Sequence, residues 1–209
     1  MSRNREVASK VTGLCAFPEI TAKVVTSIQG LKPEAAKKLF KVSDALWTEV
    51  AAMWGNDLKS YTNPKAGLRG LTAYSGEAFK FLNTAELSPE GNLNAQQSLY
   101  ILSALYGVVS ANMHIAPYRL EMQSRLEVTP HRNLYSLWRP VLTQWVNALD
   151  APFVIDACSG EYSKAIDWKN IKRPYVQVDF KQLKNGQIKS VSAFSKQARG
   201  AFVRWCLEN

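Results

Sequence analysis

The stretch LYSLWRPVLTQWVNALDAPFVI, residues 134–155, changes its hydrophobic period once, and this change indicates the fold class. Its first part has apolar residues at helical spacing, namely Leu134, Trp138, Val141, Trp145 and Leu149. They predict a helix over residues 134–149, which Pro140 is expected to kink or divide. The run FVI at residues 153–155 then has the length and composition of a strand. A helix followed so closely by a strand is typical of a chain that mixes both kinds of element.

The sequence after this stretch predicts a hairpin. Residues 176–180 alternate between apolar and polar, residues 188–194 follow with further apolar positions, and Asn185-Gly186 between them is a favoured turn. A terminal helix is expected from Ser195, as its N-cap. Helices with a mixed, partly antiparallel sheet predict the mixed α/β (α+β) class. Because 209 residues suffice for one substantial core, residues 1–209 are expected to form a single compact domain.

The first half of the chain is predicted to be mainly helical. Residues 18–27 are a short helix, residues 29–32 a turn, and Pro33 begins a second helix that extends to about residue 54. The buried stripe of this second helix is predicted to contain Leu39, Ser43, Leu46, Val50 and Met53. Further along, residues 71–76 predict a short strand and residues 94–109 a helix.

The charge of the chain favours a polyanionic partner. Lysine and arginine number 26 against 17 aspartate and glutamate residues, which gives a net charge of +9. Residues 1–82 and 151–209 each carry +5, whereas residues 83–150 carry −1. Double-stranded DNA is therefore the expected partner, in preference to an anionic membrane surface or an acidic protein. The alternative is a charge that only keeps the protein soluble.

Cysteine and histidine are too few for a disulfide framework or a metal site. Cys15, Cys158 and Cys206 are widely spaced and odd in number, and only His114 and His131 accompany them. We therefore expect a reducing, cytoplasmic location, with no metal and no cofactor. A nucleophilic role for Cys158 is not expected, because neither histidine has a patterned relation to it. No apolar run reaches the roughly 20 residues that cross a bilayer and no secretory signal is visible, so no membrane attachment is expected.

The break between the first two predicted helices is the most specific local pattern. The stretch IQGLKPEAA, residues 28–36, resembles a helix-hairpin-helix motif, which binds DNA without regard to sequence. In such a motif a glycine turn presents main-chain N–H groups and a helix N-terminus to a phosphate. Lys32 stands where a second glycine is usual. The alternative is an ordinary helical hairpin with a solvated lysine face. The predicted DNA-binding residues are Lys23, Gly30, Leu31, Lys32, Lys37, Lys38 and Lys41.

Six blocks of sequence, in order, resemble the YaaA family of peroxide stress proteins. They are YSG (74–76), LSALYGV (102–108), PYRLEM (117–122), LYSLW (134–138), SGEYSK (159–164) and KQARG (196–200). The resemblance implies a compact mixed α/β fold with a helix-hairpin-helix element, DNA binding, and protection against hydrogen peroxide by restraining free iron and DNA damage. The chain lacks the family's usual N-terminal Ser-Pro-Ala-Lys-Thr motif and departs from its pattern at residues 110–113 and at Asp156. For that reason no enzymatic activity is carried over.

The matched blocks also predict a cleft that could hold a phosphate or a carboxylate. Arg119 and Glu121 are two apart in an extended segment and so share a face, while Lys196 and Arg199 are neighbours on the last helix. The alternative for Arg119 and Glu121 is a buried network that fixes the fold. The predicted lining consists of Tyr106, Tyr118, Arg119, Glu121, Ser159, Glu161, Lys196 and Arg199.

Three functional hypotheses follow. The first, which we expect, is a sequence-tolerant DNA-binding protein of the hydrogen peroxide stress response that uses the helix-hairpin-helix element. The second is an enzyme that acts on a phosphorylated or nucleotide-like small molecule in a cleft around Arg119, Glu121, Ser159 and Arg199. The third is a protein-interaction subunit that kept the fold and lost its ancestral site. The sequence identifies no catalytic residue.

Overall fold

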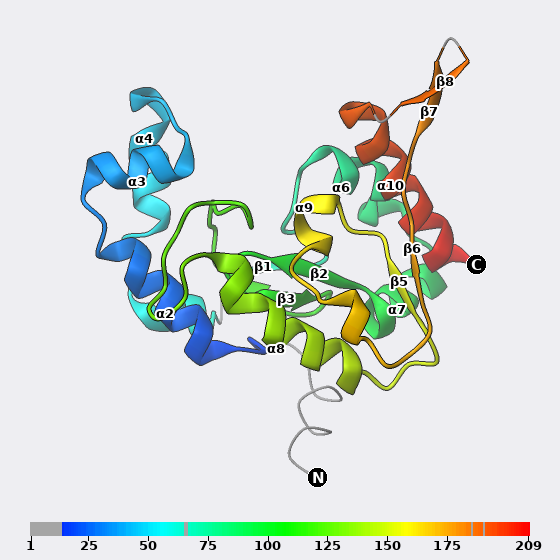
Figure 1. Cartoon of the computed structure of the whole chain (residues 1–209), viewed down its shortest axis with the longest axis horizontal. Helices are drawn as coiled ribbons and strands as arrows, with labels where there is room; N and C mark the ends of the chain where they lie inside the picture. Colours follow the sequence, from blue (N-terminus) through cyan, green and yellow to red (C-terminus); the bar gives the residue numbers. More distant parts are fainter. Residues whose placement is uncertain (1–13, 65–66, 185, 190) are drawn as a thin grey trace.

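The computed structural model describes residues 14–64, 67–184, 186–189 and 191–209 (Figure 1). The α-helices are α2 (Pro18–Gln29), α3 (Pro33–Phe40), α4 (Asp44–Met53), α5 (Leu58–Thr62), α6 (Glu77–Leu82), α7 (Pro89–Ser98), α8 (Leu134–Ala148), α9 (Gly160–Ser163) and α10 (Ser192–Glu208). The 3-10 helices are η1 (Thr84–Glu86) and η2 (Trp168–Asn170). The strands are β1 (Leu68–Arg69), β2 (Tyr100–Ser103), β3 (Gly107–Ser110), β4 (His114–Ile115), β5 (Val154–Asp156), β6 (Tyr175–Gln177), β7 (Gln182–Lys184) and β8 (Gln187–Lys189). The predicted mixed α/β class is confirmed.

The strands pair two by two, in both directions. β2 and β3 form an antiparallel hairpin, β1 pairs with β4 and β7 with β8 in the same antiparallel sense, and β5 pairs with β6 in parallel. The predicted mixture of parallel and antiparallel pairing is therefore present. Within the described residues, however, it is divided among separate two-stranded sheets.

The main core lies where the β2–β3 hairpin meets α8. Trp138 on α8 is fully buried, and its indole N–H donates to the carbonyl oxygen of Ala104 at 2.9 Å. Gly107 follows the hairpin turn with a φ of 70°, and a Cβ at this position would overlap the Trp138 ring. Glycine is required there for both reasons, since only glycine adopts this conformation freely and leaves room for the indole.

The helix predicted over residues 94–109 is wrong in its second half. α7 ends at Ser98, and the following residues form the β2–β3 hairpin. Residues 103–111 are all buried, so their apolar run has no polar side that could distinguish a strand from a helix. The β-branched pair Val108 and Val109 fits a buried strand better than a helix.

The long helix predicted from Pro33 is divided into α3 and α4. Lys41 ends α3 with a left-handed backbone, φ 52° and ψ 46°, and α4 begins at Asp44. The predicted apolar stripe is broken there, since Leu46 is 48% exposed while Phe40 is 6% exposed. The short strand predicted over residues 71–76 is also wrong: these residues are turns and bends that follow β1.

α8 confirms the long helix predicted from the amphipathic pattern of residues 134–149. The side chain of Asn133 accepts a hydrogen bond from the N–H of Ser136, whose hydroxyl accepts from the N–H of Asn133, and this capping box fixes the start. Pro140 lies inside the helix without dividing it. Proline removes one main-chain hydrogen bond, and here the burial of the tryptophan-rich face outweighs that loss.

The C-terminal part confirms the hairpin and the last helix with shifted boundaries. β7 and β8 flank Gly186, whose φ of 73° suits the predicted turn, while Asn185 lies outside the described residues. Of residues 176–180, which were predicted as the first arm, residues 176–177 belong to β6 beside β5 and residues 178–180 lie in no strand. α10 begins at Ser192, and the hydroxyl of Ser195 donates to the carbonyl of Phe180 rather than capping the helix.

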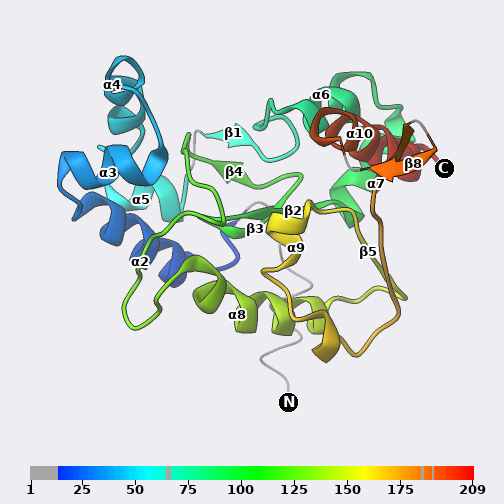
Figure 2. The same ribbon diagram turned by 45° about the horizontal axis from the view of Figure 1, so that its top comes forward.

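Two groups of elements project from the β2–β3 hairpin and α8 at opposite ends of the molecule. α3 and α4 form one end, α10 and the β7–β8 hairpin form the other, and α9 lies between them in both views (Figures 1 and 2). At the second end α10 packs closely on α6, where a Cβ at Gly200 would overlap the carbonyl of Ala78. Within the described part of the chain, every helix falls short of the length and apolar character that a bilayer crossing demands.

Candidate functional site

The turn between α2 and α3 is built without a left-handed residue. Gly30 has φ −78° and ψ −6°, and its N–H donates to the carbonyl of Thr26 at 3.0 Å, so α2 ends in a tight turn. Lys32 is extended, with φ −65° and ψ 148°, and is the N-cap of α3, with Pro33 as the first helical residue. Lysine therefore fits the position where the motif usually has glycine, because this geometry needs no positive φ.

The start of α3 presents main-chain N–H groups to solvent. The first helical hydrogen bond at this end runs from Ala36 N to the carbonyl of Lys32, at 3.0 Å. Among the described residues, the N–H groups of Glu34 and Ala35 have no hydrogen-bond acceptor, and both residues are exposed. Unpaired N–H groups and the positive end of the helix dipole make this terminus attractive to an anion.

The five predicted lysines divide into two groups. Lys23, Lys32 and Lys38 are exposed and make no ion pair with any described residue. The ammonium group of Lys37 lies 2.8 Å from Asp44 and 5.9 Å from the centre of the Trp47 ring. Its hydrogen bond with Asp44 raises the pKa of Lys37 and lowers the pKa of Asp44.

This ion pair connects α3 to α4. The charge of Lys37 is therefore already paired with Asp44. Lys41 lies 3.8 Å from the carboxylate of Glu121, and both side chains stay more than half exposed.

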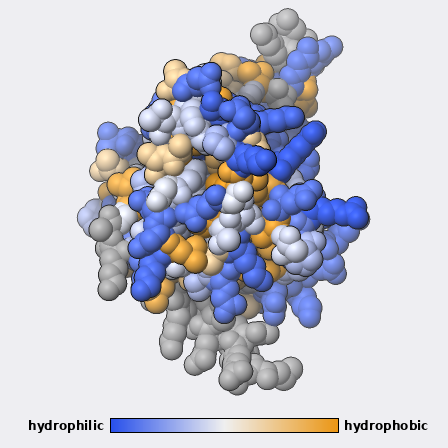
Figure 3. All heavy atoms as spheres, turned by 90° about the vertical axis from the view of Figure 1, so that its left-hand side faces the viewer, coloured by the Kyte–Doolittle hydropathy of each residue, from blue (hydrophilic) through white to orange (hydrophobic). Residues whose placement is uncertain are grey.

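Leu31, the apolar residue of the predicted turn, is partly enclosed by the protein itself. It lines an apolar hollow of about 250 Å³ beside Phe40, Trp47 and Trp54. Figure 3 shows this end of the molecule, where hydrophilic side chains predominate and hydrophobic ones appear between them.

Three hydroxyl groups form a chain beside the predicted cleft residues. The Ser103 hydroxyl lies 2.7 Å from that of Tyr118, which lies 3.1 Å from that of Tyr74. The Tyr74 ring stacks on Phe79 at 4.9 Å. Burial raises the pKa of Tyr74 and of Tyr118, so both phenols are protonated at neutral pH.

Tyr106 does not line a cleft, although the sequence had predicted that it would. It is fully buried, and its hydroxyl accepts a hydrogen bond from the N–H of Ala116.

Arg119 and Glu121 share one face, as their spacing predicts. Both are exposed, whereas Leu120 and Met122 between and after them are buried. The alternative of a buried network of these two residues is therefore wrong. Gln123 connects Glu121 to Glu161, because its N–H donates to Glu161 at 3.2 Å and its amide group donates to Glu121 at 3.4 Å.

The other predicted cleft residues lie around α9 and α10. Ser159 precedes α9, and Lys196 is exposed on α10. Arg199 donates from its guanidinium group to the carbonyls of Ala157 and Cys158 and lies 5.1 Å from the Phe180 ring centre. Its partial burial lowers the pKa of Arg199. Arg199 therefore fixes the loop before α9 through Nη1, which makes both of these hydrogen bonds.

Three polar groups in this region were not predicted from the sequence. Tyr74 and Ser103 stand inside the matched blocks but were not assigned to the cleft. Asp156, noted only as a departure from the family pattern, is 5% exposed and accepts hydrogen bonds from Cys158 N, the Ser163 hydroxyl and the Gln177 amide group. Burial and the charge of Asp156 raise the pKa of the Cys158 thiol. In the ranges that the structure describes, no group of three or more His, Cys, Asp or Glu residues is placed to hold a metal ion.

Comparisons with known proteins agree with the resemblance of the six blocks. The family described as "Peroxide stress protein YaaA" matches residues 2–209. A "UPF0246 protein" of Shewanella pealeana is 37% identical over 183 residues, which cover 86% of this chain and 71% of that protein. A "UPF0246 protein" of Limosilactobacillus fermentum is 36% identical over 196 residues, which cover 92% of this chain and 77% of that protein.

Proposed function

Since the chain belongs to the family of the peroxide stress protein YaaA, we propose that it binds double-stranded DNA as part of the cytoplasmic response to hydrogen peroxide. Binding is to the phosphate backbone and independent of sequence. The contact surface is the turn at Gly30 together with the start of α3, assisted by Lys23, Lys32 and Lys38.

The observation that carries this proposal is the open N-terminus of α3. The N–H groups of Glu34 and Ala35, exposed and without acceptors in the described structure, point to a phosphate oxygen as their partner. Lys32 is the N-cap of the same helix, so its side chain begins two residues before Glu34. Lys38 lies one turn beyond Glu34 on the exposed side of α3.

The free lysines set the expected salt dependence. Each phosphate that a lysine neutralises releases condensed counterions, so the logarithm of the binding constant falls by about 0.9 per contact for each tenfold rise in salt. With Lys23, Lys32 and Lys38 in contact, we expect a slope of about −3. Lys37 and Lys41 are left out of this count because acidic side chains already pair with them.

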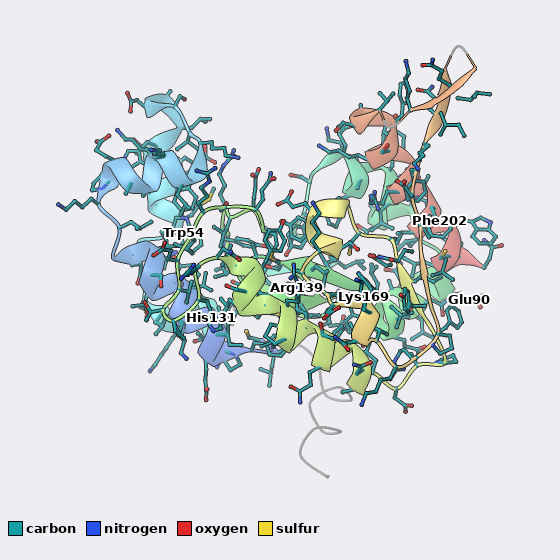
Figure 4. All side chains as sticks on the ribbon, viewed as in Figure 1. Trp54, Glu90, His131, Arg139, Lys169 and Phe202 are labelled. Atoms are coloured by element: carbon teal, nitrogen blue, oxygen red, sulfur yellow. The ribbon has the colours of Figure 1, made fainter. Side chains whose placement is uncertain are left out.

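The test is a charge reversal at the proposed contact. The variant Lys32→Glu/Lys38→Glu is expected to abolish binding to a labelled duplex in fluorescence anisotropy. The matched control is Lys169→Glu/Lys172→Glu, which makes the same change in net charge. Both lysines are exposed; Lys169 lies in η2 (Figure 4) and Lys172 follows it. An equal loss of affinity in both variants would show that net charge alone explains the effect. Unchanged binding by Lys32→Glu/Lys38→Glu would reject this surface as the DNA contact.

The contacts of the cleft residues give less support to an enzyme. Arg199, one of the four residues around which the cleft was predicted, donates from Nη1 to two main-chain carbonyls. Glu121 is near Lys41, and Glu161 accepts from the main chain of Gln123. These contacts leave Arg119 as the exposed cation of the four residues around which that hypothesis was built.

A further inference from the structure

We propose that the β7–β8 hairpin is a second DNA contact, which inserts Leu183 and Ile188 into the minor groove, separates two stacked base pairs and bends the duplex. The inference rests on the proposed DNA binding and adds a contact surface at the other end of the molecule. It assigns a role to two exposed apolar side chains that the phosphate contact at α3 does not use.

The two apolar side chains of the hairpin are the most exposed large hydrophobic residues in the described part of the chain. Leu183 and Ile188 are each 71% exposed. They lie directly opposite each other in the antiparallel register, so both side chains are on one face of the two-stranded ribbon. Single exposed apolar residues are common on protein surfaces, whereas adjacent ones that form a patch indicate a contact surface.

The hairpin is anchored at its base and projects beyond it. The hydroxyl of Ser195 on α10 donates to the carbonyl of Phe180 at 2.8 Å, just before β7 begins. A hollow of about 260 Å³ lies at this junction and is lined by Phe180 and Phe194 among others. Leu183 and Ile188 lie farther out, toward the turn, where Figure 1 shows the hairpin extending past α10. The apolar pair is therefore presented away from the body of the protein.

The charge around the pair fits a polyanionic partner. Residues 180–207 contain six lysine and arginine residues and no aspartate or glutamate. Lys181, at the base of the hairpin, is paired with Asp179 at 3.0 Å. Lys189 follows Ile188, is exposed, and makes no ion pair with any residue that the structure describes. Positive charge without acidic neighbours attracts DNA phosphates, and the ammonium group of Lys189 can contact one beside the groove.

The composition of the ribbon favours a groove of DNA over an anionic membrane. Minor-groove proteins insert side chains such as leucine and isoleucine between base pairs, and one or two of them suffice for a kink. Binding to a membrane surface strengthens with the apolar area that is buried, and two aliphatic side chains offer little. Gln187 and Lys189, on either side of Ile188, alternate to the opposite face, so the apolar surface of the ribbon stays narrow.

The hairpin and the start of α3 can contact the same duplex. They belong to opposite ends of the molecule and project to the same side of α8 (Figures 1 and 2). A duplex of about 30 base pairs is ~100 Å long, which exceeds the width of a compact protein of 209 residues. The contact at α3 is to phosphates and leaves the bases stacked. Any kink is therefore expected at the hairpin.

The test measures the bending of a duplex of about 30 base pairs that carries a donor and an acceptor fluorophore at its two ends. The wild-type protein should bend it by about 20–90° and so raise the energy transfer. Leu183→Thr/Ile188→Thr should lose the bend and still bind, because threonine favours a strand but its hydroxyl makes it a poor apolar wedge. The matched control is Ile155→Thr/Val176→Thr, an opposed and exposed pair on β5 and β6 that should bend DNA as the wild-type protein does.

Each outcome decides. Binding of DNA by the wild-type protein without a bend would overturn the hairpin contact and leave the phosphate contact at α3 standing. A bend that persists in Leu183→Thr/Ile188→Thr, with wild-type circular dichroism, would overturn the assignment to this pair. Binding to phosphatidylserine vesicles that this variant loses, without a bend in DNA, would make the hairpin a membrane contact and overturn the inference. Failure of the wild-type protein to bind any duplex would reject the proposed function and this inference together.

Discussion

The ammonium group of Lys41 lies 3.8 Å from the carboxylate of Glu121. Lys41 belongs to the predicted DNA-binding element and Glu121 to the predicted cleft, and 80 residues of sequence separate them. The contact makes the end of α3 and the segment after β4 neighbours. A strand bound at one of the two regions is therefore within reach of the other.

Replacing Glu121 by glutamine should strengthen binding to double-stranded DNA. Glu121→Gln frees Lys41 and removes a negative charge, so binding to fully paired duplex should strengthen by a factor of about 2 to 5, the value of one exposed ion pair. Anisotropy titrations at low salt measure the effect, and an unchanged affinity would show that Lys41, once freed, makes no contact with DNA.

A methyl group at Gly200 should destabilise the protein strongly. Gly200→Ala places a Cβ against the carbonyl of Ala78, a main-chain atom that can yield only if α10 moves away from α6. We expect a loss of about 1–3 kcal/mol in the free energy of unfolding, the usual range for overpacking at a close contact. Urea denaturation measures the loss. Gly160→Ala is the control, because a Cβ there meets no atom within 4 Å, and an equal loss in both variants would refute the close-contact explanation.

Acid should weaken the contact between the last helix and α7. Glu208 accepts hydrogen bonds from the hydroxyl and the N–H of Ser88, which lower its pKa. A lowered folded-state pKa means that this stabilisation is present above about pH 4.3, the ordinary glutamate value, and is lost as the pH falls through the folded-state pKa. Denaturation midpoints measured from pH 7 downward should therefore fall less steeply in Glu208→Gln than in the wild-type protein. If the midpoints of the two proteins fall equally steeply with pH, another carboxylate is the main cause of the loss of stability in acid.

The cysteines should react slowly with hydrogen peroxide. Burial raises the pKa of Cys15, Cys158 and Cys206, and only the thiolate is a strong nucleophile. At pH 7 we expect trapping of sulfenic acid to proceed more slowly than for free cysteine, as measured by mass spectrometry of dimedone adducts. Fast labelling at Cys158 in the folded protein would instead indicate a direct peroxide sensor.

The sequence by itself determined the elements whose signal is local. The amphipathic spacing of residues 134–149 predicted α8, Gly186 marked the last hairpin, and residues 28–36 predicted the turn before α3, because each pattern lies within a few residues of chain. The six matched blocks also indicated the family. The shared face of Arg119 and Glu121 was predicted for the same reason: both are exposed beside buried Leu120 and Met122, an alternation between adjacent residues.

The tertiary structure alone decided the rest. Residues 103–111, which include the hairpin turn and β3, are all buried, so they carry no period that could separate a strand from a helix. Which lysines remain free depends on where Asp44 and Glu121 come to lie. The hydroxyl chain joins Tyr74, Ser103 and Tyr118, which are 15 to 44 residues apart along the chain. Hydrogen bonds act over about 3 Å in space, and distance along the sequence says little about such proximity once the chain has folded.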